Sequence, residues 1–240
     1  MTPAPFQPTR WTLVLRSRGT DDVAKAALSE LCETCYDPVV AFLTRQLGQP
    51  DAAREAAHEF FAALLGGSLT LAADPTRGRF RSYLLGAVKH FLANRHASSS
   101  SRKRGGEVDH GTLDEAMAVA HETDAAEAHF DRDWAFALIS RALAALEAEM
   151  STAGKATHFT ALQPWLIGGG EVPQSNVAQA LGLSENALRV ALHRLRQRFR
   201  DHVRREVAQT VDSPADVSAE LRHLIDVVAA FAGDGPATFA

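Results

Sequence analysis

Helical periodicity is the feature of this sequence that most restricts its fold. In every long segment the apolar residues recur at every third or fourth position, and no stretch alternates apolar and polar residues between turn signals, as a strand does. The sequence therefore predicts an all-α fold. Helices are expected at residues 22–34, 37–47, 51–65 and 79–96, and then at 130–150, 154–167, 174–181, 185–209 and 214–231.

A segment of different composition separates these helices into two sets. Residues 99–133 are rich in serine, glycine and acidic side chains and poor in large apolar ones, which is typical of a flexible linker. We therefore predict two helical domains, over 10–98 and 134–211, joined by a flexible acidic linker. Four aromatic residues are expected in the core of the second domain: Trp134, Phe136, Phe159 and Trp165.

The C-terminal region, 212–240, carries one more amphipathic helix. Ser213 can cap it, Pro214 suits its first turn, and Asp216 completes a capping box. Its apolar stripe must pack on something, and consists of Val217, Leu221, Leu224, Ile225 and Val228. Three positions stay open for this helix: on its own domain, between the two domains, or on a regulator. Because its acidic residues oppose the basic helix at 185–209, shielding of that helix from DNA is a further alternative.

The charges are segregated, although the formal net charge is only −4. Of the 25 lysines and arginines, eight lie in residues 77–104, which contain no carboxylate, and seven lie in 185–205. Acidic residues concentrate elsewhere, with nine in 105–133 against the single Arg132. Two basic patches of this kind predict a polyanionic partner.

Several function classes are disfavoured by the sequence. No apolar run is long enough to span a membrane and no secretory signal begins the chain, so we expect a cytoplasmic protein with no membrane partner. Cys32 and Cys35 lie in a helical pattern without a second pair, which favours core residues over a redox or zinc site. No arrangement of nucleophile, phosphate loop or metal ligands is present, so neither enzymatic activity, a cofactor nor a metal is expected.

Residues 177–200 have the spacing of a helix-turn-helix. Ala178 is expected to face the core, Gly182 to occupy a turn where a side chain would collide, Ser184 to cap the second helix, and Leu188 to make the next core contact. Such a unit places its second helix in the major groove of DNA.

The second helix divides into two faces. The buried stripe is predicted to be Leu188, Ala191, Leu192, Leu195, Phe199 and Val203, and the opposite face to be Glu185, Asn186, Arg189, His193, Arg196 and Arg200. Asn186, Arg189 and His193 are the candidates for reading bases, and Arg194, Arg196 and Arg200 for binding phosphates; Ser184, at the start of the helix, is also expected to contact DNA. Two alternatives are a solvated basic face and, for Arg194 and Arg198, pairing with acid in the same domain.

A resemblance to a known family follows from four quoted stretches: REAAHEFF at 54–61, ADPTRGRFRSYLLGAVKHFLANR at 73–95, AGKATHF at 153–159, and LSENALRVALHRLRQRFRDHVRREVAQTV at 183–211. Over about residues 10–211 the chain resembles the bacterial RNA polymerase sigma factors of the small, two-domain extracytoplasmic-function type, in a subgroup with a C-terminal extension. The resemblance implies a first domain that binds core RNA polymerase and the minus-10 element of promoter DNA, and a second domain that reads the minus-35 element.

The basic stretch at the start of the fourth helix would then meet the opened promoter. Cations at a helix N-terminus oppose the helix dipole, and unpaired DNA strands supply a reason for them. The residues expected to contact the minus-10 element are Thr76, Arg77, Arg79, Arg81, Lys89 and His96. The alternative is that these arginines bridge to acid within the bundle. Phe80 and Tyr83 are more simply core residues than platforms for a base.

The third helix would bind the core polymerase. Asp51, Glu55 and Glu59 form a row one turn apart, and the resemblance implies contacts from Glu55, His58, Glu59 and Phe60. The alternative is that the carboxylates only solvate the helix. Further partners are an anti-sigma protein or another regulator, and phosphorylation or the tail itself could also control activity. A different hypothesis is an autonomous helix-turn-helix regulator that binds duplex DNA as a dimer.

Overall fold

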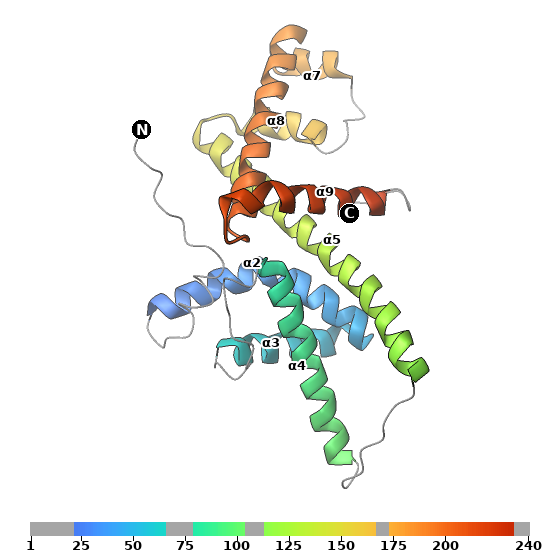
Figure 1. Cartoon of the computed structure of the whole chain (residues 1–240). Coiled ribbons are helices and arrows are strands. Elements are labelled where there is room, and N and C mark those ends of the chain that lie inside the picture. The colour runs from blue at the N-terminus through green and yellow to red at the C-terminus, as the bar shows by residue number, and fades with distance from the viewer. Residues whose placement is uncertain (1–21, 66–78, 104–112, 167–172, 233–240) are drawn as a thin grey trace. The chain divides into compact units, whose positions relative to one another are not determined.

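The structure is a computed structural model that describes residues 22–65, 79–103, 113–166 and 173–232 (Figure 1). Every regular element within those ranges is a helix, which confirms the predicted all-α class. The chain divides into two compact units. Unit 1 is Met1–Ala137 together with Ala208–Ala240, and unit 2 is Leu138–Val207.

Unit 1 contains α2 (Asp22–Leu47), α3 (Pro50–Leu65), α4 (Phe80–Lys103), the first part of α5 (Leu113–Thr152), the short 3₁₀ helix η3 (Pro214–Asp216) and α9 (Val217–Ala232). The prediction of two helices over 22–47 is wrong, because α2 continues through Pro38. A proline inside a helix costs about 3 kcal/mol. Burial of Cys35, Val39 and Phe42 around it offsets that cost.

Aromatic side chains form much of the core of unit 1. The rings of Phe42 and Phe130 meet edge to face with centroids 5.9 Å apart, and Phe80 lies 6.0 Å from Trp134. Trp134 is fully buried there. Its predicted place in the core of the second domain is therefore wrong, because α5 begins well before it and its indole packs against α4.

The linker predicted over 99–133 is largely helical. Residues 99–103 belong to α4 and 113–133 to α5, so the prediction of a flexible linker is wrong for them. Residues 104–112 lie outside the described part of the chain. Residues 113–133 contain many alanines and glutamates, which are strong helix formers, and Phe130 gives the helix a buried anchor.

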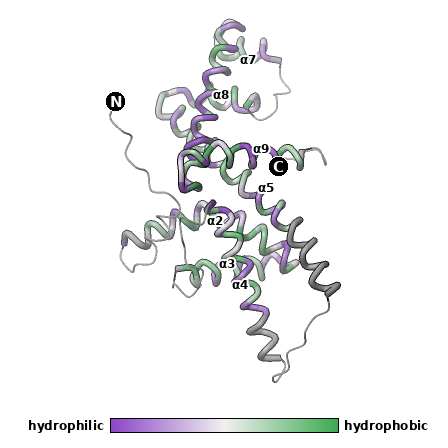
Figure 2. Tube along the Cα trace, in the orientation of Figure 1, coloured by the Kyte–Doolittle hydropathy of each residue, from purple (hydrophilic) through white to green (hydrophobic). Residues whose placement is uncertain are grey.

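Unit 2 contains the remainder of α5, then α6 (Ala156–Leu162), η2 (Gln163–Leu166), α7 (Gln174–Ala180) and α8 (Glu185–Ala208). Its helices pack around one apolar cluster of Leu146, Met150, Phe159, Leu162, Ala178, Leu188 and Leu195. Hydrophilic residues recur along α8, as the purple segments of its tube show (Figure 2). One stripe of α8 therefore serves the core and the rest of its surface is polar.

The C-terminal helix α9 belongs to unit 1. As predicted, the hydroxyl of Ser213 accepts a hydrogen bond from the N–H of Ala215, at 3.2 Å, at the start of η3. The predicted apolar stripe is only partly correct: Leu224 is buried, but Ile225 is 64% exposed. In the described ranges no helix has the length and apolar character needed to cross a membrane.

Candidate nucleic-acid interface

The turn between α7 and α8 is fixed by a glycine and a serine. Gly182 has φ +65°, a conformation that glycine adopts without strain. A Cβ built there would meet nothing within 4 Å, so the predicted collision is wrong, and the backbone conformation is what requires glycine. The hydroxyl of Ser184 accepts a hydrogen bond from the N–H of Ala187 at 3.2 Å, which confirms the predicted cap.

The inner face of α8 follows the predicted stripe. Leu188, Leu192 and Leu195 are buried, and Ala191, Phe199 and Val203 are half-buried. Sequence reasoning missed His202, which is also buried and whose Nε2 lies 2.7 Å from Oε2 of Glu149. The sequence did contain a signal for this burial: His202 follows Leu195 by seven residues and so lies on the same side of the helix.

This histidine also affects the acid beside it. The hydrogen bond from His202 lowers the pKa of Glu149, and the positive charge of Arg198 acts in the same direction. Partial burial opposes both effects but does not outweigh them. Glu149 is therefore held in its ionised form and anchors α5 to the inner side of α8.

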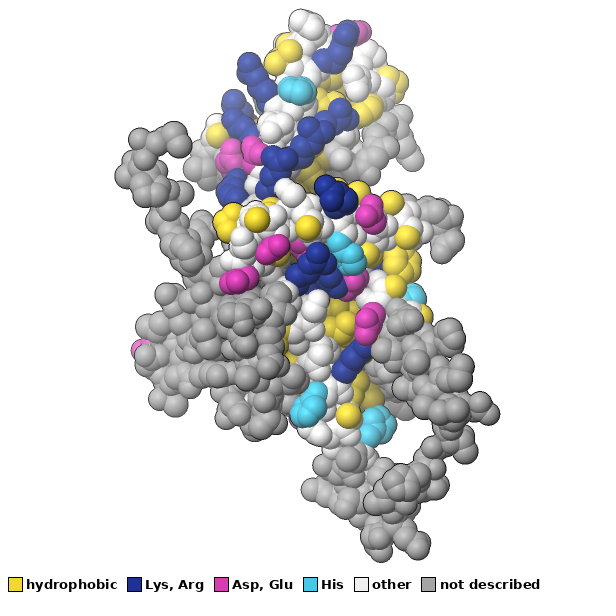
Figure 3. Space-filling model, viewed as in Figure 1, with side chains coloured by type: hydrophobic (Ala, Val, Ile, Leu, Met, Phe, Trp, Pro, Cys, Tyr) yellow, Lys and Arg dark blue, Asp and Glu magenta, His cyan; other side chains and the backbone are white. Residues whose placement is uncertain are grey.

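The outer face of α8 is exposed at every predicted position: Glu185, Asn186, Arg189, His193, Arg196 and Arg200. Lys and Arg side chains gather over this helix in the space-filling view (Figure 3). Nη2 of Arg189 lies 3.7 Å from Oε2 of Glu185, with both side chains about two-thirds exposed (67% and 65%). An exposed pair of this kind contributes at most about 1 kcal/mol, so it leaves Arg189 available.

The other outward side chains divide into anchored and unbonded groups. Arg196 donates from Nη2 to the carbonyl oxygen of Trp165 at 3.0 Å, which fixes its guanidinium over η2. Within the ranges that the structure describes, nothing bonds to the side chains of Asn186, His193, Arg194 or Arg200. The outer face thus presents unneutralised cations beside hydrogen-bonding groups.

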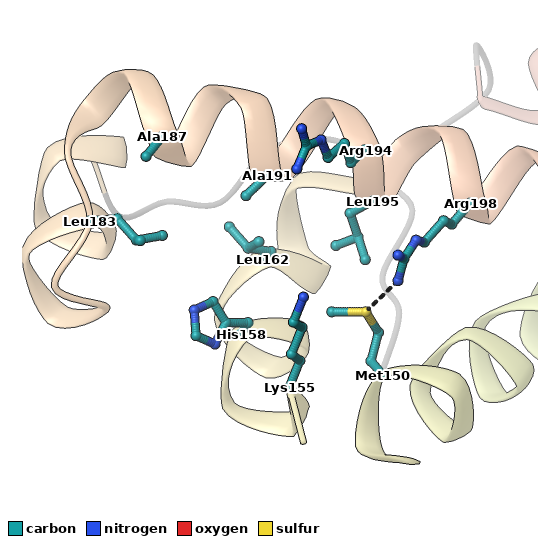
Figure 4. Close-up of a pocket in the computed structure, with 10 residues that line it drawn as sticks. All are labelled: Met150, Lys155, His158, Leu162, Leu183, Ala187, Ala191, Arg194, Leu195 and Arg198. Atoms are coloured by element: carbon teal, nitrogen blue, oxygen red, sulfur yellow. Dashed lines mark hydrogen bonds between the residues drawn. The ribbon is translucent and has the colours of Figure 1, made fainter. Parts of the chain in front are cut away.

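Arg194 and Arg198 line a pocket of about 250 Å³ between α6 and α8 (Figure 4). Nη1 of Arg198 lies 3.3 Å from Oε1 of Glu149 and donates to Sδ of Met150 at 3.5 Å. The alternative of pairing with acid in the same unit therefore holds for Arg198 but not for Arg194. Lys155 and His158 add basic groups to the lining, whose apolar part is Met150, Leu162, Leu183, Ala187, Ala191 and Leu195.

The basic residues at the start of α4 are bound to acid within unit 1. Arg81 is buried: its Nε lies 3.2 Å from Oε1 of Glu220, and its Nη1 pairs with Asp131. Arg79 is half-buried, with Nε 2.9 Å from Oε2 of Glu220. The expectation that Arg81 lies on an open DNA-binding surface is wrong for this arrangement, because the carboxylates of α5 and α9 enclose its guanidinium.

The other residues proposed for the minus-10 element lie in mixed surroundings. Lys89 is half-buried and pairs with Glu127 of α5, and His96 is exposed. Thr76 and Arg77 lie outside the described residues. Phe80 is fully buried, which confirms the simpler prediction of a core role for that ring.

The four residues proposed for polymerase binding separate into two groups. Glu55, His58 and Glu59 are exposed on α3. Phe60 is fully buried and packs against Phe91, so its predicted surface contact is wrong; the ring lies on the core side of the helix. Glu59 is paired, with Oε2 2.6 Å from Nη1 of Arg95.

The two cysteines are both free, and Cys35 is buried in the core of unit 1. Burial raises the pKa of the half-buried Cys32 thiol, and the charges of Cys35 and Glu33 add to this effect. A raised pKa disfavours the reactive thiolate. No group of three or more metal-ligating side chains occurs in the described ranges.

Comparisons with protein-family models, with curated proteins and with solved structures gave no match to this chain.

Proposed function

We propose that this protein is a promoter-specificity subunit of bacterial RNA polymerase, of the sigma type, in which α7 and α8 form a helix-turn-helix that reads duplex DNA. The single observation that carries the proposal is the outer face of α8. After a capped turn at Gly182 and Ser184, that face exposes Arg189 and Arg200 without any buried acid partner, and Arg194 is exposed at the edge of the pocket beside it. Free guanidinium groups along one face of a helix suit phosphates and guanine edges.

The first turns of α8 supply the groups that would meet bases. Asn186, Arg189 and His193 are exposed there and can donate or accept hydrogen bonds. Arg200 lies two turns further along, where it would contact the sugar-phosphate backbone. This order matches the way a recognition helix enters the groove with its N-terminal residues toward the bases.

Unit 1 would bind the core polymerase. Glu55 and His58 are exposed on α3, and nothing within the described ranges pairs with Glu55. His58 lies 3.4 Å from the hydroxyl of Tyr36 on α2, so the two helices present one polar surface. Cytoplasmic location, core polymerase, promoter DNA and a regulator such as an anti-sigma protein belong to this proposal together.

The deciding experiment is a gel shift and run-off transcription on a promoter library, with and without core polymerase. Binding and transcription that need core support the proposal, and sequencing of the bound DNA identifies both promoter elements. Transcription that is the same with and without this chain would refute it.

Substitutions on α8 test which residues read DNA. Arg189→Ala should cost about 1–3 kcal/mol of discrimination at one base position. Arg200→Ala should weaken binding to all sequences, and should reduce the slope of the log binding constant against the log salt concentration by about one, as the loss of one phosphate contact predicts. Arg222→Ala is the matched control, because it removes the same charge from an exposed residue of α9. If both α8 variants bind like Arg222→Ala, the helix does not contact DNA.

One observation favours a second function, that of an autonomous regulator which binds duplex DNA without opening it. Arg79, Arg81 and Lys89 are bound to carboxylates, while Arg194 and Arg200 of α8 bind nothing within the described ranges. A duplex-binding regulator would need only the latter. Tight binding to a two-fold symmetric site by the chain alone, unaffected by core polymerase, would support that function over the first.

A further inference from the structure

The C-terminal helix α9 supplies the acid that neutralises the start of α4. The side chain of Glu220 is only 1% exposed, and its two oxygens face two different arginines: Oε1 accepts a hydrogen bond from Nε of Arg81 at 3.2 Å, and Oε2 forms an ion pair with Nε of Arg79 at 2.9 Å without a hydrogen bond. One carboxylate at the far end of the chain is therefore shared by both guanidinium groups.

The segment that leads into α9 binds the same end of α4. The N–H of Phe80 donates to the carbonyl oxygen of Thr210 at 3.0 Å, and the first turn of α4 contains no acidic residue of its own. Guanidinium groups and the N–H donors of a helix N-terminus are the groups that hold phosphate in proteins. Here, oxygens from the C-terminal region already occupy them.

We propose that α9 is an intramolecular competitor of nucleic acid at the start of α4. While Glu220 binds Arg79 and Arg81, these cations cannot bind a DNA strand, and α9 must leave α4 before they can. This inference rests on the proposed function, which assigns both arginines to the opened promoter. The contact is autoinhibitory, because in the free chain α9 blocks the two arginines that would bind a DNA strand.

The contact between α9 and the rest of unit 1 is suited to opening. The apolar stripe of α9 is incompletely buried: Leu224 is buried, Val217, Leu221 and Val228 are half-buried, and Ile225 is 64% exposed. Near the end of α9, the ring of Phe231 lies 5.2 Å from that of His129 and 4.9 Å from the guanidinium of Arg132. The attraction within buried ion pairs is largely offset by desolvation. A polyanion that offers the arginines new partners can therefore displace the helix.

Opening would affect the two arginines differently. Arg81 also pairs with Asp131 of α5, and Asp131 in turn binds Nε2 of His223 on α9 at 2.8 Å. After α9 leaves, Arg81 keeps Asp131, whereas Arg79 loses Glu220. Arg79, which is already 37% exposed, is the cation that opening makes available first.

The test uses the full-length chain and a fluorescein-labelled dT12 oligonucleotide, with binding followed by fluorescence anisotropy. Glu220→Gln removes the charge of the side chain but keeps its shape. This variant should bind dT12 about tenfold more tightly than the wild type, because a larger fraction of the chains has Arg79 and Arg81 available for DNA. Asp226→Asn is the matched control: it makes the same charge change at an exposed position of α9, and its affinity should stay within about twofold of the wild type. Adding Arg79→Ala to Glu220→Gln should remove the gain.

A second measurement decides the question even if Glu220→Gln does not fold. In the wild type, saturating dT12 should accelerate hydrogen exchange of the backbone amides of α9. Unchanged exchange in α9 with dT12 bound, or equal dT12 affinities for a folded Glu220→Gln variant and the wild type, would overturn the proposal. Promoter selection by α8 is tested separately with Arg189→Ala, so the proposed competition by α9 can be wrong while the proposed function holds, and the reverse.

Discussion

Replacing Arg81 by methionine tests the charge cluster of unit 1 most directly. The guanidinium side chain is 7% exposed and binds two acids, Asp131 at 12% and Glu220 at 1% side-chain exposure. Methionine fills a similar volume but leaves both carboxylates without that cation. Breaking a buried pair in this way costs about 3–5 kcal/mol.

The remaining partners place the expected loss at the low end of that range. Glu220 keeps Arg79 at 2.9 Å, and Asp131 keeps His223 at 2.8 Å, so neither acid is fully uncompensated. We therefore expect Arg81→Met to lower the free energy of unfolding of unit 1 by about 3 kcal/mol. Urea unfolding followed by far-UV circular dichroism measures this, with the slope of the transition compared between variants.

Two further variants separate the charge effect from lost packing. Arg54→Met is the control, because Arg54 is 59% exposed and its one ion pair among the described residues is with the exposed Asp51; its effect should be below about 0.5 kcal/mol. Adding Asp131→Asn and Glu220→Gln to Arg81→Met should restore part of the stability, since no unpaired charge is left buried. A loss below about 0.5 kcal/mol for Arg81→Met itself would refute the buried cluster.

Two other predictions concern Gly182 and Glu149 of unit 2, with Gly86 of unit 1 as a comparison for the first. Gly182→Ala should destabilise it by about 1 kcal/mol, because alanine is strained at φ +65°, whereas Gly86→Ala, inside α4 with open space at its Cβ, should stabilise unit 1 by about 0.5–1 kcal/mol; thermal unfolding compares them. Because the pKa of Glu149 is lowered in the folded state, its contribution is present above the ordinary carboxyl pKa and is lost as the pH falls through the folded value. The Glu149 side chain is 42% exposed, so Glu149→Gln should cost less than about 1 kcal/mol at pH 7, and this cost should shrink as the pH falls through the folded pKa, as urea midpoints at decreasing pH would show. An effect of Glu149→Gln that grows as the pH falls would contradict this sign.

The positions of most helices and both faces of α8 could be predicted from the sequence because periodicity, caps and turn residues are local signals. Leu188, Leu192 and Leu195 lie on the core side for the same reason that Arg189 and Arg200 do not. Gly182 was predicted at the correct place for the wrong reason, since a sequence shows where a turn falls but not which torsion angle it adopts.

The surroundings of Arg81 could not be predicted in the same way. Its partners lie 50 and 139 positions away, and no local pattern pairs residues at such distances. One signal was present: Arg81 shares a helical stripe with Leu85 and Leu92, both of which are buried. A second apolar stripe on α4 indicates a helix covered on two sides, and α5 and α9 bring acid to that second side.

Unit 1 is assembled from both ends of the chain, and this has a consequence for synthesis. All of unit 2 is translated before Glu220, which follows Arg81 by 139 positions. At about 5–20 residues per second, the ribosome needs roughly 7–28 s to cover that interval. Asp131 follows Arg81 by 50 positions, so it is made partway through this interval and is then the only acid of the cluster available to Arg81, whereas Arg79 has none until Glu220 is made. Until α9 has been synthesised, polyanions such as the translated mRNA can therefore reach Arg79 and Arg81 of the nascent chain.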